Sequence, residues 1–215
     1  MNNTSVTYYE NPRREMIHFL PSHYSKVLEI GCGCGRFRGN LSSSCEYWGV
    51  EPMAHIAETA RTDGLHVLTG TYEQVSHLLP DCAFDLIICN DVIEHMIDPW
   101  IFLQDIKHKL APNGVIVGSV PNIRHIFALK HILIDKDWHY RNYGIFDRTH
   151  LHFFTMKSFR RMVNDAGYDV QLLSGIYKDK FSGWYKYAFW LKFIPALFLG
   201  FDTPFSQIAF RIKSN

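Results

Sequence analysis

The sequence predicts an α/β fold, in which a doubly wound, mostly parallel seven-stranded sheet carries an antiparallel edge and inserted helices after the fifth strand. Two observations lead to this prediction. Apolar runs of strand length alternate along the chain with segments of helical period. The runs are almost continuously apolar, as expected of parallel strands buried on both faces. The hydrophobic residues, 47% of the chain, can supply the core of such a fold.

The expected elements of the first half follow one another in a regular order. A short helix over residues 12–20 comes first. We expect strands over residues 26–30, 46–50, 66–68, 84–89 and 115–120. Helices are expected between them, from residue 37 onward and over residues 52–62, 72–79 and 99–110. The last of these helices has the strongest start signal, because Asp98 is a good N-cap and Pro99 suits the first helical position.

The second half of the chain is expected to close the sheet. An apolar helix follows residue 121, and an aromatic segment continues to residue 154. A helix over residues 155–166 is closed by Gly167 and followed by a strand over residues 168–173. A final strand is expected over residues 207–212. These last two strands would form the antiparallel edge.

A glycine-rich turn, with Gly31, Gly33 and Gly35, directly follows the first expected strand. Glycine lets the backbone turn tightly and approach a ligand at the carboxyl edge of an open α/β sheet. Glu51 lies 20 residues after Gly31, at the end of the second strand, where a carboxylate can accept both ribose hydroxyls of a nucleoside. A dinucleotide fingerprint would need glycine at position 36, where this chain has Arg36. The spacing therefore favours a nucleoside without phosphates.

Several strand ends resemble motifs of class I S-adenosylmethionine-dependent methyltransferases. Residues 27–35, VLEIGCGCG, resemble the first motif, and residues 49–52, GVEP, resemble the second. Residues 84–95, FDLIICNDVIEH, are similar to the fourth-strand motif, and residues 110–115, LAPNGV, to the turn before the fifth strand. The resemblance covers residues 25 to 120 and implies S-adenosyl-L-methionine as the cofactor.

The same resemblance implies where the cofactor binds. The three glycines would pass under its methionine part, and Glu29 would hold the turn and the amino group. Asn90 would border the methionine part, and Met53 would flank the adenine. At the turn after the third strand the family usually has an acidic residue, whereas this chain has Thr71. The expected cofactor-binding residues are Tyr9, Arg14, Glu29, Gly31, Gly33, Gly35, Glu51, Pro52, Met53, Thr71, Asn90 and Asp91.

The N-terminal residues resemble the lid of this family. Tyr8-Tyr9 and Arg13-Arg14 would close over the cofactor and its carboxylate, and a plain surface helix is the alternative. No linker, repeat or low-complexity tract divides the sequence, so we expect a single methyltransferase domain over residues 1–215. Its expected parts are residues 1–24 as an N-terminal lid or helix, 25–120 as the cofactor-binding core, and 121–215 as acceptor-side insertions and closing strands.

The acceptor half resembles a narrower group. Residues 147–155, DRTHLHFFT, are similar to a pattern of methyltransferases associated with bacterial glycan and cell-envelope biosynthesis. The usual pattern has arginine where this chain has His152. That departure puts an anion contact at this position in doubt.

Transfer to a hydroxyl needs a base and an acceptor held in line, about 3 Å from the methyl group. His95, His150 and His152 are the candidate catalytic residues, because imidazole titrates near neutral pH. A structural role is the alternative for each. A metal site made by His139, Asp147, His150 and His152 is another, but alternating histidines on a strand-like segment more often make polar contacts. We therefore expect no metal.

Net charge and composition limit which partners and which cellular location we expect. The net charge is +1 and the basic residues are scattered, which argues against nucleic acid. Five cysteines without paired spacing and the lack of a recognisable signal peptide favour a cytoplasmic protein. The aromatic segment over residues 184–201 is expected to pack in the core or in a homodimer seam. Its alternative role is peripheral contact with a membrane or a lipid-linked acceptor.

The main functional prediction is O-methylation of a sugar or glycan precursor, as a small molecule or linked to a lipid. One alternative is O-methylation of a quinone or another phenolic acceptor, because the fourth-strand motif also resembles quinone-biosynthesis methyltransferases. A second alternative is a partner subunit that binds the cofactor without catalysis. The sequence does not identify the acceptor, since acceptor pockets in this fold are built from variable insertions.

Overall fold

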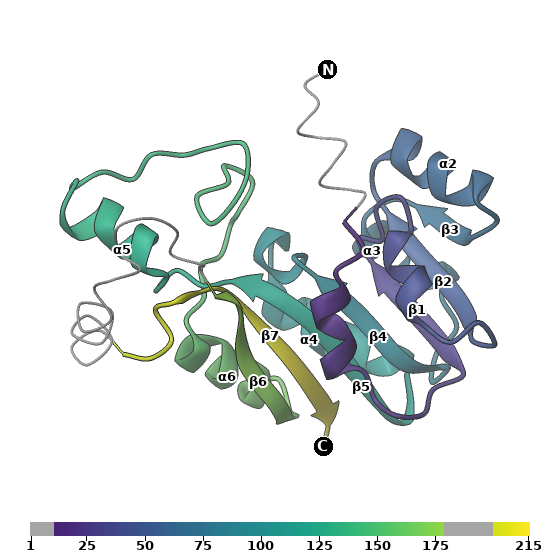
Figure 1. The fold of residues 1–215 in the computed structure, drawn as a ribbon. Coiled ribbons are helices and arrows are strands. Elements are labelled where there is room, and N and C mark those ends of the chain that lie inside the picture. The colour runs from purple at the N-terminus through teal and green to yellow at the C-terminus, as the bar shows by residue number, and fades with distance from the viewer. Residues whose placement is uncertain (1–10, 179–199) are drawn as a thin grey trace.

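The computed structural model describes residues 11–178 and 200–215, and it confirms the predicted fold (Figure 1). Within these residues the sheet has seven strands in the order β3-β2-β1-β4-β5-β7-β6. The first five strands pair in parallel, and β7 runs antiparallel to both β5 and β6. The predicted antiparallel edge is therefore present. The predictions for Tyr8, Tyr9 and residues 184–199 fall outside the described residues.

The elements have the following bounds. The strands are β1 (Lys26–Ile30), β2 (Glu46–Glu51), β3 (His66–Thr69), β4 (Phe84–Asn90), β5 (Leu110–Pro121), β6 (Tyr168–Lys178) and β7 (Phe205–Ser214). The α-helices are α2 (Ala54–Thr62), α3 (Tyr72–Val75), α4 (Pro99–Ile106), α5 (Ile126–Leu133) and α6 (Met156–Asp165). Short 3-10 helices are η1 (Arg14–Phe19), η2 (Arg36–Asn40), η3 (Ser76–Leu78), η4 (Ile93–His95) and η5 (Lys107–Lys109).

Several expected helices are shorter than predicted. The segment that begins near residue 37 forms only the 3-10 helix η2, because Gly39 and the serines of residues 42–44 are poor helix formers. The helix expected over residues 99–110 ends as η5, and Leu110 already pairs with Phe84 as part of β5. Asp98 caps α4 as predicted, accepting hydrogen bonds from the amides of Trp100 and Ile101.

Two hydrophobic clusters cover the two faces of the sheet. Alternate residues of one strand enter different clusters, as the period of a strand requires. On β4, Ile87 and Cys89 pack with α3, α4 and α6, whereas Leu86 and Ile88 pack with η1, η2 and α2. The parallel strands are therefore buried on both sides, which explains their continuous apolar sequence.

The strand order places a crevice at the carboxyl ends of the central strands. Strand β1 lies between β2 and β4. Strands β2 and β3 therefore extend the sheet on one side of β1, and β4 and β5 extend it on the other. Ligands of open α/β sheets bind at such a switch point. In Figure 1, α2 and β3 lie at one side of the sheet, and α5 and the long loop that follows it lie at the opposite side. Among the described residues, no helix is long and apolar enough to cross a membrane.

Candidate active site

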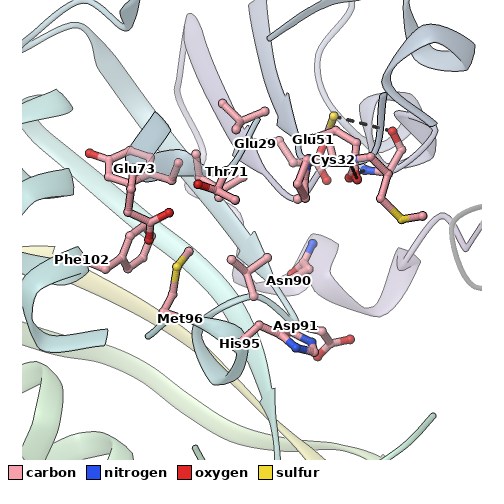
Figure 2. Close-up of a pocket in the computed structure, with 18 of the residues that line it drawn as sticks. Glu29, Cys32, Glu51, Thr71, Glu73, Asn90, Asp91, His95, Met96 and Phe102 are labelled. Atoms are coloured by element: carbon pink, nitrogen blue, oxygen red, sulfur yellow. Dashed lines mark hydrogen bonds between the residues drawn. The ribbon is translucent and has the colours of Figure 1, made fainter. Parts of the chain in front are cut away.

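An open cavity of about 1230 Å³ lies where β1, β2 and β4 end. Ligand pockets commonly measure ~300–1,000 Å³, so this cavity has room for a nucleoside and a second small molecule. Figure 2 shows Glu29 and Glu51 in one part, His95 and Asp91 in another, and Asn90 between them. We call the first part, around Glu29 and Glu51, the cofactor end. We call the second part, around Asp91 and His95, the histidine end.

The glycine turn forms one wall of the cofactor end. Gly31, Gly33 and Gly35 have φ angles of 68°, 54° and 73°, a left-handed conformation that favours glycine. A Cβ atom on Gly31 would lie 2.8 Å from Val92 Cγ2. Gly31 and Gly33 line the cavity, whereas Gly35 lies behind them against Leu65. The turn therefore exposes backbone to a ligand, and it leaves no room for a side chain at Gly31 or Gly35.

Glu51 is held by the backbone around it. One carboxylate oxygen accepts a hydrogen bond from the Gly33 amide at 2.9 Å, and the other accepts one from the Met53 amide at 3.0 Å. Burial raises the pKa of Glu51, although the two amides act in the opposite direction. Each oxygen keeps a lone pair beyond its amide contact, so the carboxylate can still accept two hydroxyl groups.

Glu29 is buried at the end of β1 and faces the same space. It accepts a hydrogen bond of 2.6 Å from the Tyr47 hydroxyl. Burial raises the pKa of Glu29 to about 8; the Tyr47 hydrogen bond opposes this shift, and the charge of Glu51 adds to it. A cationic ligand group at this end would favour the ionised carboxylate and so gain binding energy from it.

Asn90, at the end of β4, has an unsatisfied side chain. Its amide nitrogen and its amide oxygen are both buried without a hydrogen-bond partner. Leaving such groups unpaired costs about 1–3 kcal/mol, so their presence at the cavity needs an explanation. A ligand that offers a donor and an acceptor would satisfy both. Other predicted cofactor residues, Pro52, Met53 and Thr71, also line the cavity.

Asp91 is engaged with the protein itself. Its carboxylate accepts hydrogen bonds from Ser119 Oγ at 2.9 Å and Gln207 Nε2 at 2.9 Å, and it pairs with Arg13. Arg13 also donates to Gln207 Oε1 at 2.8 Å. This network ties the N-terminal residues to β4, β5 and β7. Asp91 lines the cavity as predicted, but most of its hydrogen-bonding capacity is used within the protein.

The lid prediction for Arg14 needs correction. Arg14 is exposed and is not among the residues that line the cavity, whereas Arg13 lines it. Arg13 has a φ angle of 48°, and this left-handed turn directs its side chain to Asp91 while η1 begins at the next residue. The sequence placed both arginines in the lid and only Arg14 among the cofactor-binding residues, because the backbone turn at Arg13 is not visible in the sequence.

The histidine end is assembled from two distant segments. His95 belongs to η4 and lines the cavity, and its Nδ1 lies 3.1 Å from the carbonyl oxygen of Thr149. The amides of Leu151 and His152 donate to the carbonyl oxygen of Glu94 at 2.9 and 3.1 Å. Residues 149–152 are therefore fixed on η4, although more than 50 residues separate them in sequence.

The structure brings together two of the three candidate catalytic histidines. The rings of His95 and His150 lie edge to face, with their centroids 4.8 Å apart. His150 Nδ1 lies 3.0 Å from the carbonyl oxygen of Ile145, and burial lowers the pKa of His150. His152 instead contacts the carbonyl oxygen of Ile97 through Nε2 at 3.3 Å. Of the three histidines, only His95 lines the cavity.

Glu94 is a functional candidate that sequence reasoning missed. Its side chain is fully buried, and neither carboxylate oxygen has a hydrogen-bond partner. Burial raises the pKa of Glu94 well above its usual range, and the nearby charge of Asp91 acts in the same direction. A donor atom of Glu94 lies within 4.8 Å of donor atoms of His95 and His150. Among the described residues, the alternative metal set with His139, Asp147 and His152 does not come together in this way.

Comparison with known proteins gives a family match over most of the chain. The profile of a methyltransferase domain family matches residues 8–173. The ubiquinone biosynthesis O-methyltransferase of Bradyrhizobium diazoefficiens is 32% identical over 101 residues, covering 45% of this chain and 40% of the relative. The enzyme of the same name from Rickettsia canadensis is 25% identical over 184 residues, covering 76% of this chain and 73% of the relative. The match thus spans less than half the length of the first relative.

Solved structures show the same fold. A SAM-dependent methyltransferase from Thermotoga maritima is 20% identical, with a TM-score of 0.66 and coverage of 97% of this chain and 89% of that one. A SAM-dependent methyltransferase from Archaeoglobus fulgidus is 18% identical, with a TM-score of 0.67 and coverage of 97% and 94%. At these identities, the likeness concerns the arrangement of strands and helices.

Proposed function

This chain belongs to the methyltransferase domain family, and we propose that it is an S-adenosylmethionine-dependent enzyme that methylates a hydroxyl of a phenolic or hydroquinone-like acceptor. The class of enzyme and the cofactor follow from the family, while the acceptor is the proposed part. Relatives named for ubiquinone biosynthesis support the phenolic alternative better than the sugar or glycan acceptor that the sequence favoured.

The cofactor end suits S-adenosylmethionine. Glu51 offers two acceptor atoms for the ribose hydroxyls, and Glu29 can ionise beside the cationic amino group. The unsatisfied amide of Asn90 can pair with the amino and carboxylate groups of the methionine part. The glycine turn allows the backbone to approach that part closely. These features lie at the cofactor end and, for Asn90, between the two ends, so a bound cofactor leaves the histidine end for the acceptor.

The observation that carries the acceptor assignment is the apolar composition of the cavity wall beside the histidine end. Apolar side chains of Met96, Ile97, Ile101 and Phe102 line the cavity beside His95. Ile97 is 88% exposed and Ile101 is 63% exposed, so both are open to contact with a ligand. A sugar would bring several hydroxyl groups against this surface and leave them unpaired, at a cost of about 1–3 kcal/mol each when buried. An aromatic ring has apolar faces and loses nothing there.

The chemistry needs few protein groups. S-Adenosylmethionine, held by Glu29, Glu51 and Asn90, would supply a methyl group on a sulfonium that an acceptor oxygen can displace, with the bonding electrons of the C–S bond going to sulfur. The protein has to hold the acceptor oxygen in line and exclude water. The acceptor hydroxyl must also lose its proton. We assign this activation to the histidine end, because His95 faces the cavity there with His150 behind it.

An acceptor panel tests the proposal. The protein is incubated with methyl-labelled S-adenosylmethionine and with catechols, hydroquinones, hexoses and nucleotide sugars. We expect methyl ethers on the phenolic compounds and none on the sugars. A catechol with both hydroxyls already methylated serves as the matched blank. Transfer to sugars without transfer to phenols would contradict the proposal. Cofactor binding without transfer to any acceptor would support the partner-subunit alternative instead.

A further inference from the structure

We propose that Trp138 is a positioning residue for methyl transfer, which holds residues 138–153 in the fold that fixes the His95 ring at the cavity. We call residues 138–153 the aromatic loop. Trp138 is not among the described residues that line the cavity, so it acts through other residues. Its effect on transfer rests on the proposed function and deepens it, whereas its effect on the His95 ring does not depend on the acceptor.

The aromatic loop lacks the support that a helix or a sheet gives. Among the described residues, no helix or strand lies between the end of α5 and the start of α6. Within the loop, an isolated bridge joins Arg141 to Asp147. Compact surface loops of this kind are held together by the packing of their own side chains. The conformation of the aromatic loop therefore depends on which of its side chains pack together.

The Trp138 ring joins the start of the aromatic loop to its middle and its end. Its centroid lies 4.9 Å from that of Phe146, at an interplanar angle of 82°, and 4.9 Å from that of Phe153, at 89°. Both are edge-to-face arrangements, which aromatic pairs favour. Phe146 is buried and also contacts His131 of α5, with ring centroids 5.9 Å apart. Loss of the indole would remove both ring contacts that hold the start of the loop.

A series of ring contacts leads from Trp138 to the cavity. Phe153 lies 6.3 Å from His150, and His150 lies 4.8 Å from His95, both measured between ring centroids. His150 Nδ1 also lies 3.0 Å from the carbonyl oxygen of Ile145 in the same loop. The aromatic loop thus sets the position of the His150 ring. His150 in turn packs against His95, which lines the cavity.

The backbone of the aromatic loop fixes the tautomer of His95. The carbonyl oxygen of Thr149 lies 3.1 Å from His95 Nδ1. A carbonyl only accepts hydrogen bonds, so Nδ1 carries the proton and Nε2 keeps a lone pair. That lone pair can accept the proton of an acceptor hydroxyl. Without the Thr149 contact a neutral imidazole can adopt either tautomer, and only one of the two leaves Nε2 able to accept a proton.

The hydrogen bonds around Thr149 are open to water. Thr149 is exposed, and its amide and hydroxyl donate to Asp147 Oδ1 at 2.8 and 2.7 Å. Water competes for exposed hydrogen bonds, so such bonds add little to the stability of a loop. Apolar ring contacts, in contrast, are strengthened by the surrounding water. The packing around Trp138 therefore stabilises the aromatic loop more than these hydrogen bonds do.

The first test determines the tautomer of His95 by nuclear magnetic resonance. Protein labelled with nitrogen-15 histidine is measured at about pH 8.5, where unperturbed imidazoles are neutral. The chemical shifts of the two ring nitrogens show which one carries the proton, and the absence of a signal in His95→Gln identifies His95. We expect a proton on Nδ1 in the wild type and a mixture of tautomers in Trp138→Leu.

Trp48→Leu is the matched control for both tests. Trp48 also makes edge-to-face ring contacts, with His66 and Phe84, but it lies near the amino ends of β2 and β4, away from the cavity. The substitution removes the same side chain and the same kind of contact. We expect Trp48→Leu to keep the wild-type tautomer of His95.

The second test measures single-turnover methyl transfer to a hydroquinone. We expect Trp138→Leu to transfer the methyl group at least about tenfold more slowly than the wild type, because small misplacement of a reacting group is costly. Its affinity for S-adenosylmethionine should be unchanged, since the cofactor end does not contact the aromatic loop. Trp138→Phe keeps an aromatic ring, so it should transfer within about threefold of the wild type. Trp48→Leu should transfer like the wild type.

The outcomes separate this inference from the proposed function. A wild-type tautomer of His95 in Trp138→Leu, or equal transfer by Trp138→Leu and the wild type, overturns the proposal. An equal loss in Trp48→Leu also overturns it, because lower stability alone would then explain the effect. If far-UV circular dichroism shows that Trp138→Leu does not fold, Phe153→Leu provides the same test, since it breaks the series of rings before His150. If the wild type methylates no phenol, the proposed function fails, and the tautomer measurement still decides the role of Trp138.

Discussion

The cofactor end and the histidine end of the cavity are built differently. At the cofactor end, Glu51 is held by the amides of Gly33 and Met53, which lie within 18 residues of it. At the histidine end, His95 contacts Thr149, 54 residues away, and the carboxylate of Glu94 has no partner. The first part is organised by local sequence and is nearly complete in itself. The second depends on a distant segment and contains a buried carboxylate without a hydrogen-bond partner.

This difference suggests a division of labour. A preformed cofactor site holds the same small molecule whatever the acceptor is, so its geometry can be fixed by a turn and two strand ends. The histidine end depends on the segment between β5 and α6, and connecting segments of this kind generally vary more than the strands they join. The following predictions test whether the two ends are as separable as this comparison implies, in order of decreasing expected effect.

The largest effect is expected at Glu51. Glu51→Ala removes both acceptors for the ribose hydroxyls and leaves the amides of Gly33 and Met53 unpaired. We expect the affinity for S-adenosylmethionine to fall by roughly 100-fold or more, as the loss of two hydrogen bonds to a charged group implies. Isothermal titration calorimetry measures this change. Glu58→Ala, which removes an exposed carboxylate on α2, should leave the affinity unchanged, and equal affinities in both variants would refute the assignment.

The glycine turn gives the next largest effect. Gly31→Ala would place a Cβ atom 2.8 Å from Val92 Cγ2 at a φ angle of 68°, so it combines a clash with backbone strain. We expect the free energy of unfolding to fall by about 1–3 kcal/mol and cofactor binding to weaken. Gly64→Ala is the matched variant, with a φ angle of 83° and open space for its Cβ. It should lose only ~1–2 kcal/mol of stability and keep its affinity.

Asn90 should show stability and binding moving in opposite directions. Asn90→Leu replaces an unsatisfied buried amide by an apolar side chain of similar size. We expect the free energy of unfolding of the ligand-free protein to rise by about 1–2 kcal/mol, while affinity for S-adenosylmethionine falls. Urea unfolding and calorimetry on the same sample measure the two quantities. Asn164→Leu, at an exposed position on α6, should change neither, and a destabilised Asn90→Leu would mean that its amide has a partner within the protein.

The smallest effect concerns the pH dependence of stability. The pKa of Glu29 is about 8 in the folded protein and normal in the unfolded chain, so the folded state binds more protons between these values. The contribution of Glu29 to stability is therefore greatest below the pKa of the unfolded chain and is lost as the pH rises toward 8. Between pH 6.5 and 7.5 the loss of one proton from Glu29 changes the free energy of unfolding by at most ~1.4 kcal/mol. Urea unfolding at these two pH values should show a smaller change in Glu29→Gln than in the wild type, and identical changes would exclude this role.

The sequence was sufficient for the features that depend on near neighbours. The strand ends, the glycine turn and Glu51 were predicted because a buried strand followed by a glycine-rich turn is typical of a ligand site at the carboxyl edge of an α/β sheet. The Arg13 network was missed, since its partner Gln207 lies 194 residues away and nothing in the local sequence marks it. Glu94 was missed for the same reason. In the folded protein, residues 149–152 pack on η4, and the buried carboxylate of Glu94 has no hydrogen-bond partner there. Neither fact can be read from the sequence around Glu94.

The central claim is that the two ends of the cavity serve different molecules. Single-turnover methyl transfer from labelled S-adenosylmethionine to a hydroquinone, by the wild type and by His95→Gln, tests it most directly when cofactor affinity is measured on the same samples. We predict that His95→Gln binds the cofactor as tightly as the wild type and transfers the methyl group at least ~100-fold more slowly. Unchanged transfer by His95→Gln, or a parallel loss of cofactor binding, would contradict the account.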